Sequence, residues 1–245
     1  MIRLTRLHIN YLLSEKVFLF TIFLIGLSSI FLLYSANVGV SESTMMFYQE
    51  YYTKQLMIEM LNFGKILVIV YLLFMMIMGY VIHQYDVMIL NRVGIIKLKC
   101  SKMLAMWFFV LYLITIYFMI FVIIGVYITP FMVISNQYFV IYGEFLFFGF
   151  FYTMVFVYLY EISKHLLGLI AGFMFYLIVF IGSVDDIQKE DVSKGMQYLY
   201  RILLDLGYYQ GEGVGFYYDK IYYLALILGS GLIVYFLRKN ADLIN

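Results

Sequence analysis

Long uncharged apolar runs, separated by short charged segments, constrain the fold of this chain more than any other feature of its sequence. About 20 consecutive apolar residues cross the hydrocarbon core of a bilayer as an α-helix. Runs of that approximate length occupy residues 17–37, 66–82, 103–128, 138–160, 166–183 and 221–237. Only 13% of the residues are charged and 65% are hydrophobic, whereas soluble domains contain roughly 25% charged residues. The sequence therefore predicts an all-α integral membrane protein with six transmembrane helices.

The most basic segment of the chain, residues 83–102, lies between the second and third expected spans. It carries a single acid, Asp86, and four basic residues: Arg92, Lys97, Lys99 and Lys102. An excess of Lys and Arg places such a loop on the cytoplasmic side of the membrane. Apolar residues interleave with the polar ones, which predicts one or two short helices with a break at Gly94. The segment is either a topological anchor or a docking surface for a soluble partner.

An even number of spans puts both termini on the same side as this basic loop. The cytoplasmic side then holds most of the Lys and Arg residues, as the positive-inside rule requires. The outer side holds the remaining basic residues: Lys54, Lys65, Lys189, Lys194, Arg201 and Lys220. We therefore expect both termini in the cytoplasm and a single transmembrane domain over residues 1–245.

Three segments outside the spans also have helical patterns. In residues 1–16 the polar positions recur every three or four residues, which predicts an amphipathic helix in the membrane interface; the alternative is a frayed basic terminus. Residues 41–65 predict an outer helix that runs into the second span. In the outer loop, residues 184–220, an apolar stripe from Val192 to Leu206 predicts a second interfacial helix.

No motif in the sequence predicts catalysis, a cofactor or a metal. The glycines of residues 211–215 follow no strand and lack the Lys-Ser/Thr pair of a phosphate-binding loop, so they are interpreted as a linker. His83 with Asp86, and Glu161 with His165, share helix faces but have no third ligand, and structural roles are favoured for both pairs. The single cysteine, Cys100, excludes an internal disulfide. With a net charge of +1 and no basic tail, nucleic acid is not an expected partner.

Glu144 is the one acid within an expected span, and acids inside membranes usually face a cavity or a partner. It follows the outer Asn136-Gln137 turn by only about 9 Å of helix, so it can instead lie near the outer interface. The same span is unusually rich in Phe and Tyr. Packing against lipid is the default interpretation, although such a surface also suits an amphipathic or lipidic substrate. Glu144 is therefore the candidate residue of a substrate cavity.

Taken together, these segments resemble the permease subunit of ABC exporters of the six-span type-2 permease class. The resemblance extends over almost the whole chain: an amphipathic helix before span one, a helical basic loop after span two, a short turn at residues 161–165 and a helical outer loop before span six. In that family the loop after span two docks on the ATPase as a coupling helix. The resemblance implies that the docking surface here contains Tyr85, Asp86, Asn91, Arg92, Val93, Ile96 and Lys97.

The resemblance also implies a function and partners. The chain would be one half of an ATP-driven exporter of amphipathic peptides or lipid-like substrates. It would pair with a second permease copy or homologue and with an ATP-binding cassette subunit that hydrolyses ATP, so the chain itself is not expected to be an enzyme. The alternative is a membrane anchor or substrate-binding component that works without an ATPase. The Ile, Phe, Tyr, Met and Lys bias favours the cell membrane of a low-GC Gram-positive bacterium.

Overall fold

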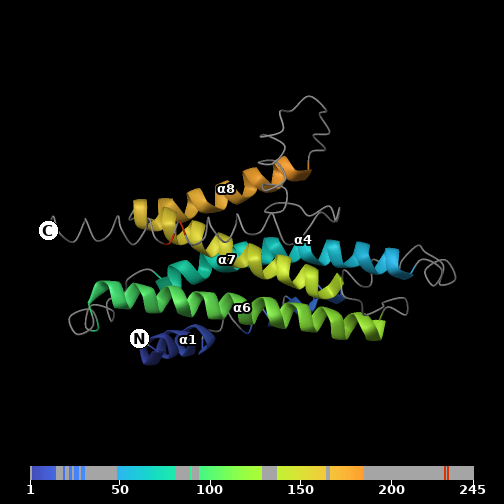
Figure 1. Cartoon of the computed structure of the whole chain (residues 1–245), viewed down its shortest axis with the longest axis horizontal. Helices are drawn as coiled ribbons and strands as arrows, with labels where there is room; N and C mark the ends of the chain where they lie inside the picture. The colour runs from blue at the N-terminus through green and yellow to red at the C-terminus, as the bar shows by residue number, and fades with distance from the viewer. Residues whose placement is uncertain are drawn as a thin grey trace. The chain divides into compact units, whose positions relative to one another are not determined.

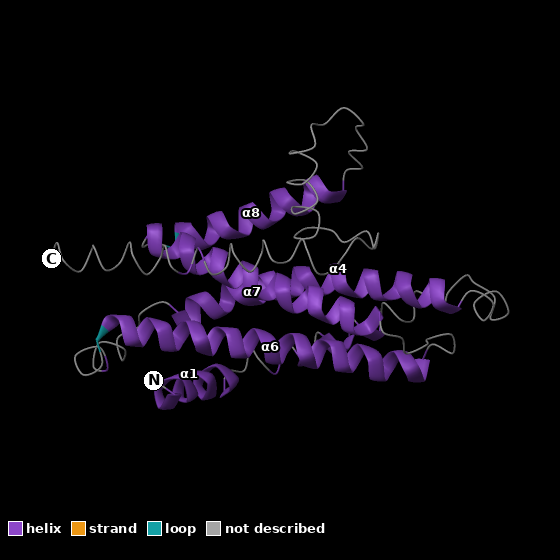
Figure 2. Cartoon of the chain, viewed as in Figure 1, coloured by secondary structure: helices purple, strands orange, loops and turns teal. Residues whose placement is uncertain are grey.

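A computed structural model describes residues 2–14, 49–80, 94–128, 137–163 and 166–184, with short helical pieces between residues 19 and 30 and single positions at residues 89, 229 and 231. Apart from Gly94 and Leu166, every described residue is helical (Figure 2). The described part of the chain is therefore all-α, as the sequence predicts.

Five α-helices and one π-helical turn make up the longer described segments (Figure 1). They are α1 (Ile2–Ser14), α4 (Gln49–Met75) with its continuation η1 (Met76–Tyr80), α6 (Ile95–Ile128), α7 (Gln137–Ser163) and α8 (Leu167–Val184). Three helical stretches among the described residues are long and apolar enough to cross a membrane: Tyr51–Met78, Lys97–Tyr127 and Tyr138–Ser163. These three stretches indicate a membrane protein. The expected spans at residues 17–37 and 221–237, and the outer loop of residues 184–220, lie largely outside the described residues.

The chain divides into two units, Met1–Gly149 and Phe150–Asn245. In the first unit α4 and α6 run antiparallel, because Tyr71 stacks on Phe109 while the Tyr117 hydroxyl, farther along α6, donates a hydrogen bond to the Met60 carbonyl earlier on α4. The first half of α7 runs antiparallel to α6 in turn. The Thr115 and Tyr142 hydroxyls lie 2.7 Å apart on these two helices, and a Cβ atom at Gly149, later on α7, would lie 2.6 Å from the side chain of Val110, earlier on α6. Successive helices therefore alternate in direction, as consecutive membrane spans do.

α6 is apolar on all sides, and burial divides it into two stripes. One stripe is buried in the unit: Leu98, Ala105, Phe109, Leu113, Tyr117 and Phe121. The other stripe is exposed on the protein surface although it is equally apolar: Phe108, Tyr112, Met119, Ile123 and Val126. A helix with an exposed apolar stripe of this length suits a lipid environment better than water.

α1 packs against α6 and η1, the two segments that flank residues 81–93 (Figure 1). Its buried face is formed by Thr5, His8 and Leu12, which follow one another at helical spacing. Arg3 and Arg6 are exposed on other faces of the helix. The structure therefore has a helix in the region where the sequence predicts one, and that helix uses one face to bind the rest of its unit.

In the second unit α8 crosses the end of α7 at two glycines spaced by four residues. A Cβ atom at Gly168 would lie 2.7 Å from the Leu159 carbonyl carbon, and one at Gly172 would lie 3.0 Å from the Phe156 ring. Small residues at this spacing allow the backbones of membrane helices to approach closely. α7 continues to Ser163, so the first three residues of the turn expected at residues 161–165 are helical, and the described chain resumes at Leu166 just before α8.

Candidate intramembrane charged site

Lys65 lies in the middle of the candidate span Tyr51–Met78. At a rise of 1.5 Å per residue, each end of that span is about 20 Å of helix away from Lys65. The sequence predicts a helix over residues 41–65 that runs into a span from residue 66, and α4 is continuous through Lys65 from Gln49 to Met75. The expected place of Lys65 at the outer side of the membrane stays a prediction.

The Lys65 side chain is almost completely buried, with 1% of its surface exposed. Its Nζ atom lies 5.3 Å from the centre of the Phe148 ring on α7, a cation–π contact. A desolvated cation–π contact contributes roughly 2 kcal/mol. Burial of an ion costs several kcal/mol even after the surrounding protein relaxes. The ring therefore offsets only part of the cost of placing an ammonium group at this depth.

The helices around Lys65 approach closely because its neighbour is a glycine. A Cβ atom at Gly64 would lie 2.6 Å from ring atoms of both Tyr117 on α6 and Phe145 on α7. The Tyr117 and Phe145 rings themselves meet edge to face, with their centres 5.7 Å apart. Three spans thus converge at the level of Lys65. Tight packing at this level limits the access of water to the charge.

Several polar groups share this part of the bundle. Asn62, one turn before Lys65 on α4, is buried. The Tyr117 hydroxyl donates to the Met60 carbonyl at 3.1 Å. The Thr115 hydroxyl donates its single proton to the Leu111 carbonyl at 2.7 Å, so Tyr142 is the donor in its 2.7 Å contact with Thr115. Polar side chains from all three spans therefore gather within a few helical turns of Lys65.

Glu144, the sequence-based candidate for a substrate cavity, lies on α7 and is half-buried. It precedes Phe148 by four residues, so the two side chains share one face of α7. Because Phe148 contacts Lys65, the structure brings Glu144 into the same region of the bundle as Lys65. Whether a cavity opens beside Glu144 stays a prediction.

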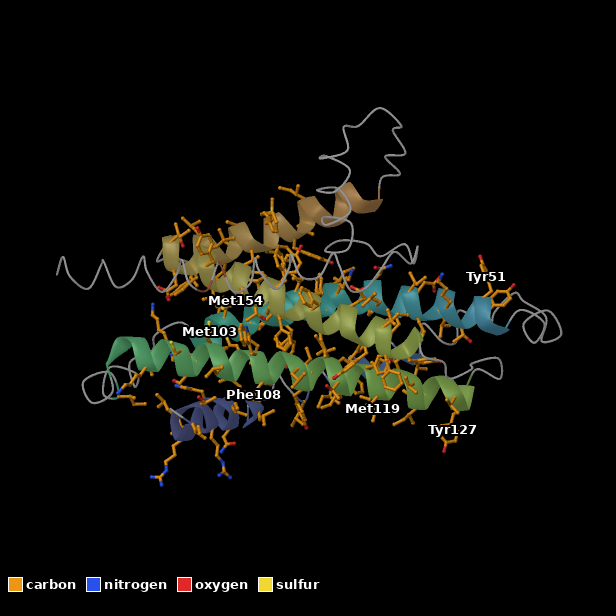
Figure 3. The ribbon with its side chains drawn as sticks, viewed as in Figure 1. Tyr51, Met103, Phe108, Met119, Tyr127 and Met154 are labelled. Carbon is orange, nitrogen blue, oxygen red and sulfur yellow. The ribbon has the colours of Figure 1, made fainter. Side chains whose placement is uncertain are left out.

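The two ends of the first unit differ in character. Tyr51 and Tyr127 lie together at one end and are highly exposed, whereas Met103 lies toward the other end (Figure 3). Tyrosine is enriched where membrane spans meet the interface. The opposite end holds η1, Gly94 and α1, and we call it the α1 end.

Two of the seven sequence-predicted docking residues lie among the described residues, at the α1 end. Tyr85, Asp86, Asn91, Arg92 and Val93 lie outside the described residues, as do His83 and His165. Ile96 and Lys97 belong to the first turn of α6, and Lys97 is exposed.

Gly94 begins α6 at the α1 end. Its backbone has a φ of +81°, and its carbonyl accepts a hydrogen bond from the Leu98 amide at 3.2 Å. α6 therefore starts directly after Gly94, and a helix before this glycine stays a prediction. Lys102, two turns into α6, is buried, so it belongs to the helix bundle and not to an exposed loop.

The described residues contain no group of three His, Cys, Asp or Glu side chains that would hold a metal ion. No protein-family model, curated protein or solved structure matches this chain. Function must therefore be argued from the chain's own residues.

Sequence reasoning missed Lys65 as a site residue, although a signal was present. The helix predicted over residues 41–65 runs into residues 66–82, and the apolar positions Leu56 and Met60 continue in phase across that boundary, which places Lys65 inside one helix.

Proposed function

We propose that this chain is the transmembrane permease subunit of an exporter that is driven by a separate ATP-binding cassette ATPase. Its substrates would be amphipathic peptides, such as toxins, bacteriocins or antimicrobial peptides, or lipid-like molecules. It would act in the cell membrane of a Gram-positive bacterium, together with a second copy of the chain or a homologous permease.

The observation that carries the proposal is the arrangement at the α1 end. Residues 81–93 connect η1 to α6, and α1 contacts both of these elements. A partner that moved this connection would therefore act on α4, on α6 and on α1 together. A ligand or partner shifts a conformational equilibrium only through contacts that differ between states, and this arrangement supports such contacts on two membrane spans at once.

The charge at this end favours a docking role. Arg92 and Lys97 flank Gly94, and Lys97 is exposed on the first turn of α6. Charged groups at the edge of an interface steer association and fix its register more than they add affinity. With Lys97 exposed at this end, it is available to an acidic surface on a soluble partner.

The test is a pull-down of the purified chain with a co-expressed ATP-binding cassette ATPase from the same genome, at low and moderate salt. Arg92→Glu or Lys97→Glu should weaken association about tenfold, since a change of 1.4 kcal/mol corresponds to a factor of ten. Lys54→Glu is the matched control, because Lys54 is exposed on α4 near the tyrosine-rich end. Val93→Asp and Ile96→Asp should reduce substrate-stimulated ATP hydrolysis in nanodiscs.

Full ATPase binding and full substrate-stimulated hydrolysis in all four of these variants would contradict the proposal. The competing function is a membrane anchor or substrate-binding component that has no ATPase partner. That alternative predicts that no ATPase co-purifies with the wild-type chain under any salt condition, whereas substrate binding to the isolated chain persists.

A further inference from the structure

We infer that Glu144 supplies the negative charge that neutralises Lys65, so that an intramembrane charge pair joins α4 to α7. The inference concerns how the bundle is held together and does not depend on the proposed export function. It gives Lys65 an ion-pair partner, which the sequence pattern does not assign.

The first step is that Lys65 needs a negative charge nearby. Its side chain is 1% exposed, within the helical stretch Tyr51–Met78 that is long and apolar enough to cross a membrane. Ionisable residues at such depth are almost always paired with one another or with backbone carbonyls. The Phe148 ring offers only its π-face, and a π-face offsets part of the burial cost without carrying a net charge.

The second step is that few acids are available. In the described helices of the first unit the acids are Glu50, Glu59 and Glu144, and α6 has none. Glu59 is exposed, whereas Lys65 is buried. Glu50 precedes Lys65 by about 22 Å of helix. Glu144 is half-buried, and it lies on a helix that already contacts the lysine.

The third step is that Lys65 on α4 and Glu144 on α7 lie at similar heights along the bundle. α4 and α7 run parallel in this unit, because Gly64 lies against Phe145 and Lys65 lies against Phe148. Side chains on α-helices lean toward the helix N-terminus. The lysine on α4 therefore reaches back toward the level of residue 144 on α7. Glu144 and Phe148 share a helix face, so the ring and the carboxylate would contact the ammonium group from neighbouring positions.

The charge pair between Lys65 and Glu144 would hold the second and fourth expected spans together. Any motion that separated α4 from α7 at this level would leave two charges unpaired inside the membrane. The two helices would therefore move as one body, and the pair would break only where other charges or water replaced its partners.

The experiment uses the full chain in lipid nanodiscs and measures the folded, monodisperse fraction after heating. Lys65→Met and Glu144→Gln should each lower the ratio of folded to unfolded protein by at least about tenfold, because one buried charge then loses its partner. The double variant should recover to within about twofold of the wild type. Glu59→Gln, alone and combined with Lys65→Met, is the matched control and should give no recovery.

A second measurement covers variants that fail to fold. In a Cys100→Ser background, cysteines at positions 65 and 144 should be joined by a short bifunctional thiol reagent, whereas cysteines at 65 and 59 should not. Losses that simply add in the double variant would overturn the inference, and so would the absence of a 65–144 cross-link in folded protein. Recovery by the charge-reversed pair, Lys65→Glu with Glu144→Lys, would support it.

Discussion

Replacement of Gly168 by alanine tests whether α7 and α8 depend on backbone contact. The added Cβ would lie 2.7 Å from the Leu159 carbonyl carbon and still closer to the Leu159 oxygen and the Ser163 hydroxyl. Carbon atoms prefer separations of about 3.5–4.0 Å, so α8 would have to move by roughly 1 Å. A backbone cannot rotate out of the way as a side chain can, which makes this contact harder to relieve than a contact with a ring.

The expected magnitude combines two opposing effects. Overpacking of this kind costs about 1–3 kcal/mol, whereas Ala is up to about 1 kcal/mol better than Gly within a helix. Gly168→Ala should therefore destabilise the second unit by about 1–2 kcal/mol, measured as a lower midpoint of thermal unfolding in detergent. Gly26→Ala is the control: that glycine is also helical, and among the described residues nothing lies within 4 Å of its added Cβ.

The two variants should shift the unfolding midpoint in opposite directions, because only one of them meets an obstacle. If Gly168→Ala raised the midpoint as Gly26→Ala should, the close crossing of α7 and α8 would be wrong. Gly172→Ala should give a smaller loss, since its Cβ would meet the edge of the Phe156 ring, which can turn.

Two further substitutions test other contacts by the same thermal measurement. Gly94→Ala should lower the free energy of unfolding by about 1–2 kcal/mol, because Gly94 has a φ of +81° and, among the described residues, nothing lies within 4 Å of its added Cβ. Gly94→Asn should lower it less, because Asn tolerates this backbone conformation better. Equal losses in the two variants would argue against the left-handed conformation. Tyr142→Phe and Thr115→Val each remove the inter-helix hydrogen bond at 2.7 Å and should cost about 0.6 kcal/mol, the average for such bonds in membranes. The double variant should lose no more than either single variant, and additive losses would mean that the hydroxyls do not interact.

Much of the helical architecture follows from the apolar composition of the sequence and from the glycine and polar residues between its apolar runs. The helical class is predicted and present in the described residues, and Gly94, where a break is predicted, has a positive φ directly before α6. These features depend on the local sequence. The apolar composition of a segment and the backbone conformation of a glycine determine them, whatever the neighbouring helices are.

The packing could not be predicted in the same way. The buried Phe109 and the exposed Phe108 are adjacent and chemically identical, so hydrophobic periodicity cannot tell the protein-facing side of α6 from the opposite side. The burial of Lys65 was also missed, because it depends on Phe148, more than 80 residues away in the sequence. Polar residues normally reveal which face of a helix is buried, and in this chain the polar groups are themselves inside the bundle.

Lys65 also has a consequence for how the chain enters the membrane during synthesis. A lysine in a membrane span costs up to about 2.5–3.5 kcal/mol, the value for the helix centre on insertion scales, which would cancel the contribution of roughly five to ten Leu-class residues. The same span contains the buried Asn62, which adds to this cost. α4 is therefore a poor candidate for independent insertion.

The residues that accommodate the lysine are synthesised much later. Phe148 follows Lys65 by roughly 80 residues, which ribosomes translate in about 4–16 s at 5–20 residues per second. If α4 does not insert alone, it would wait during that interval at the insertion machinery or at the membrane surface. The first unit would then enter the bilayer as a group of helices once α7 emerges, and any delay in translation between these two helices would prolong the exposure of a half-inserted span.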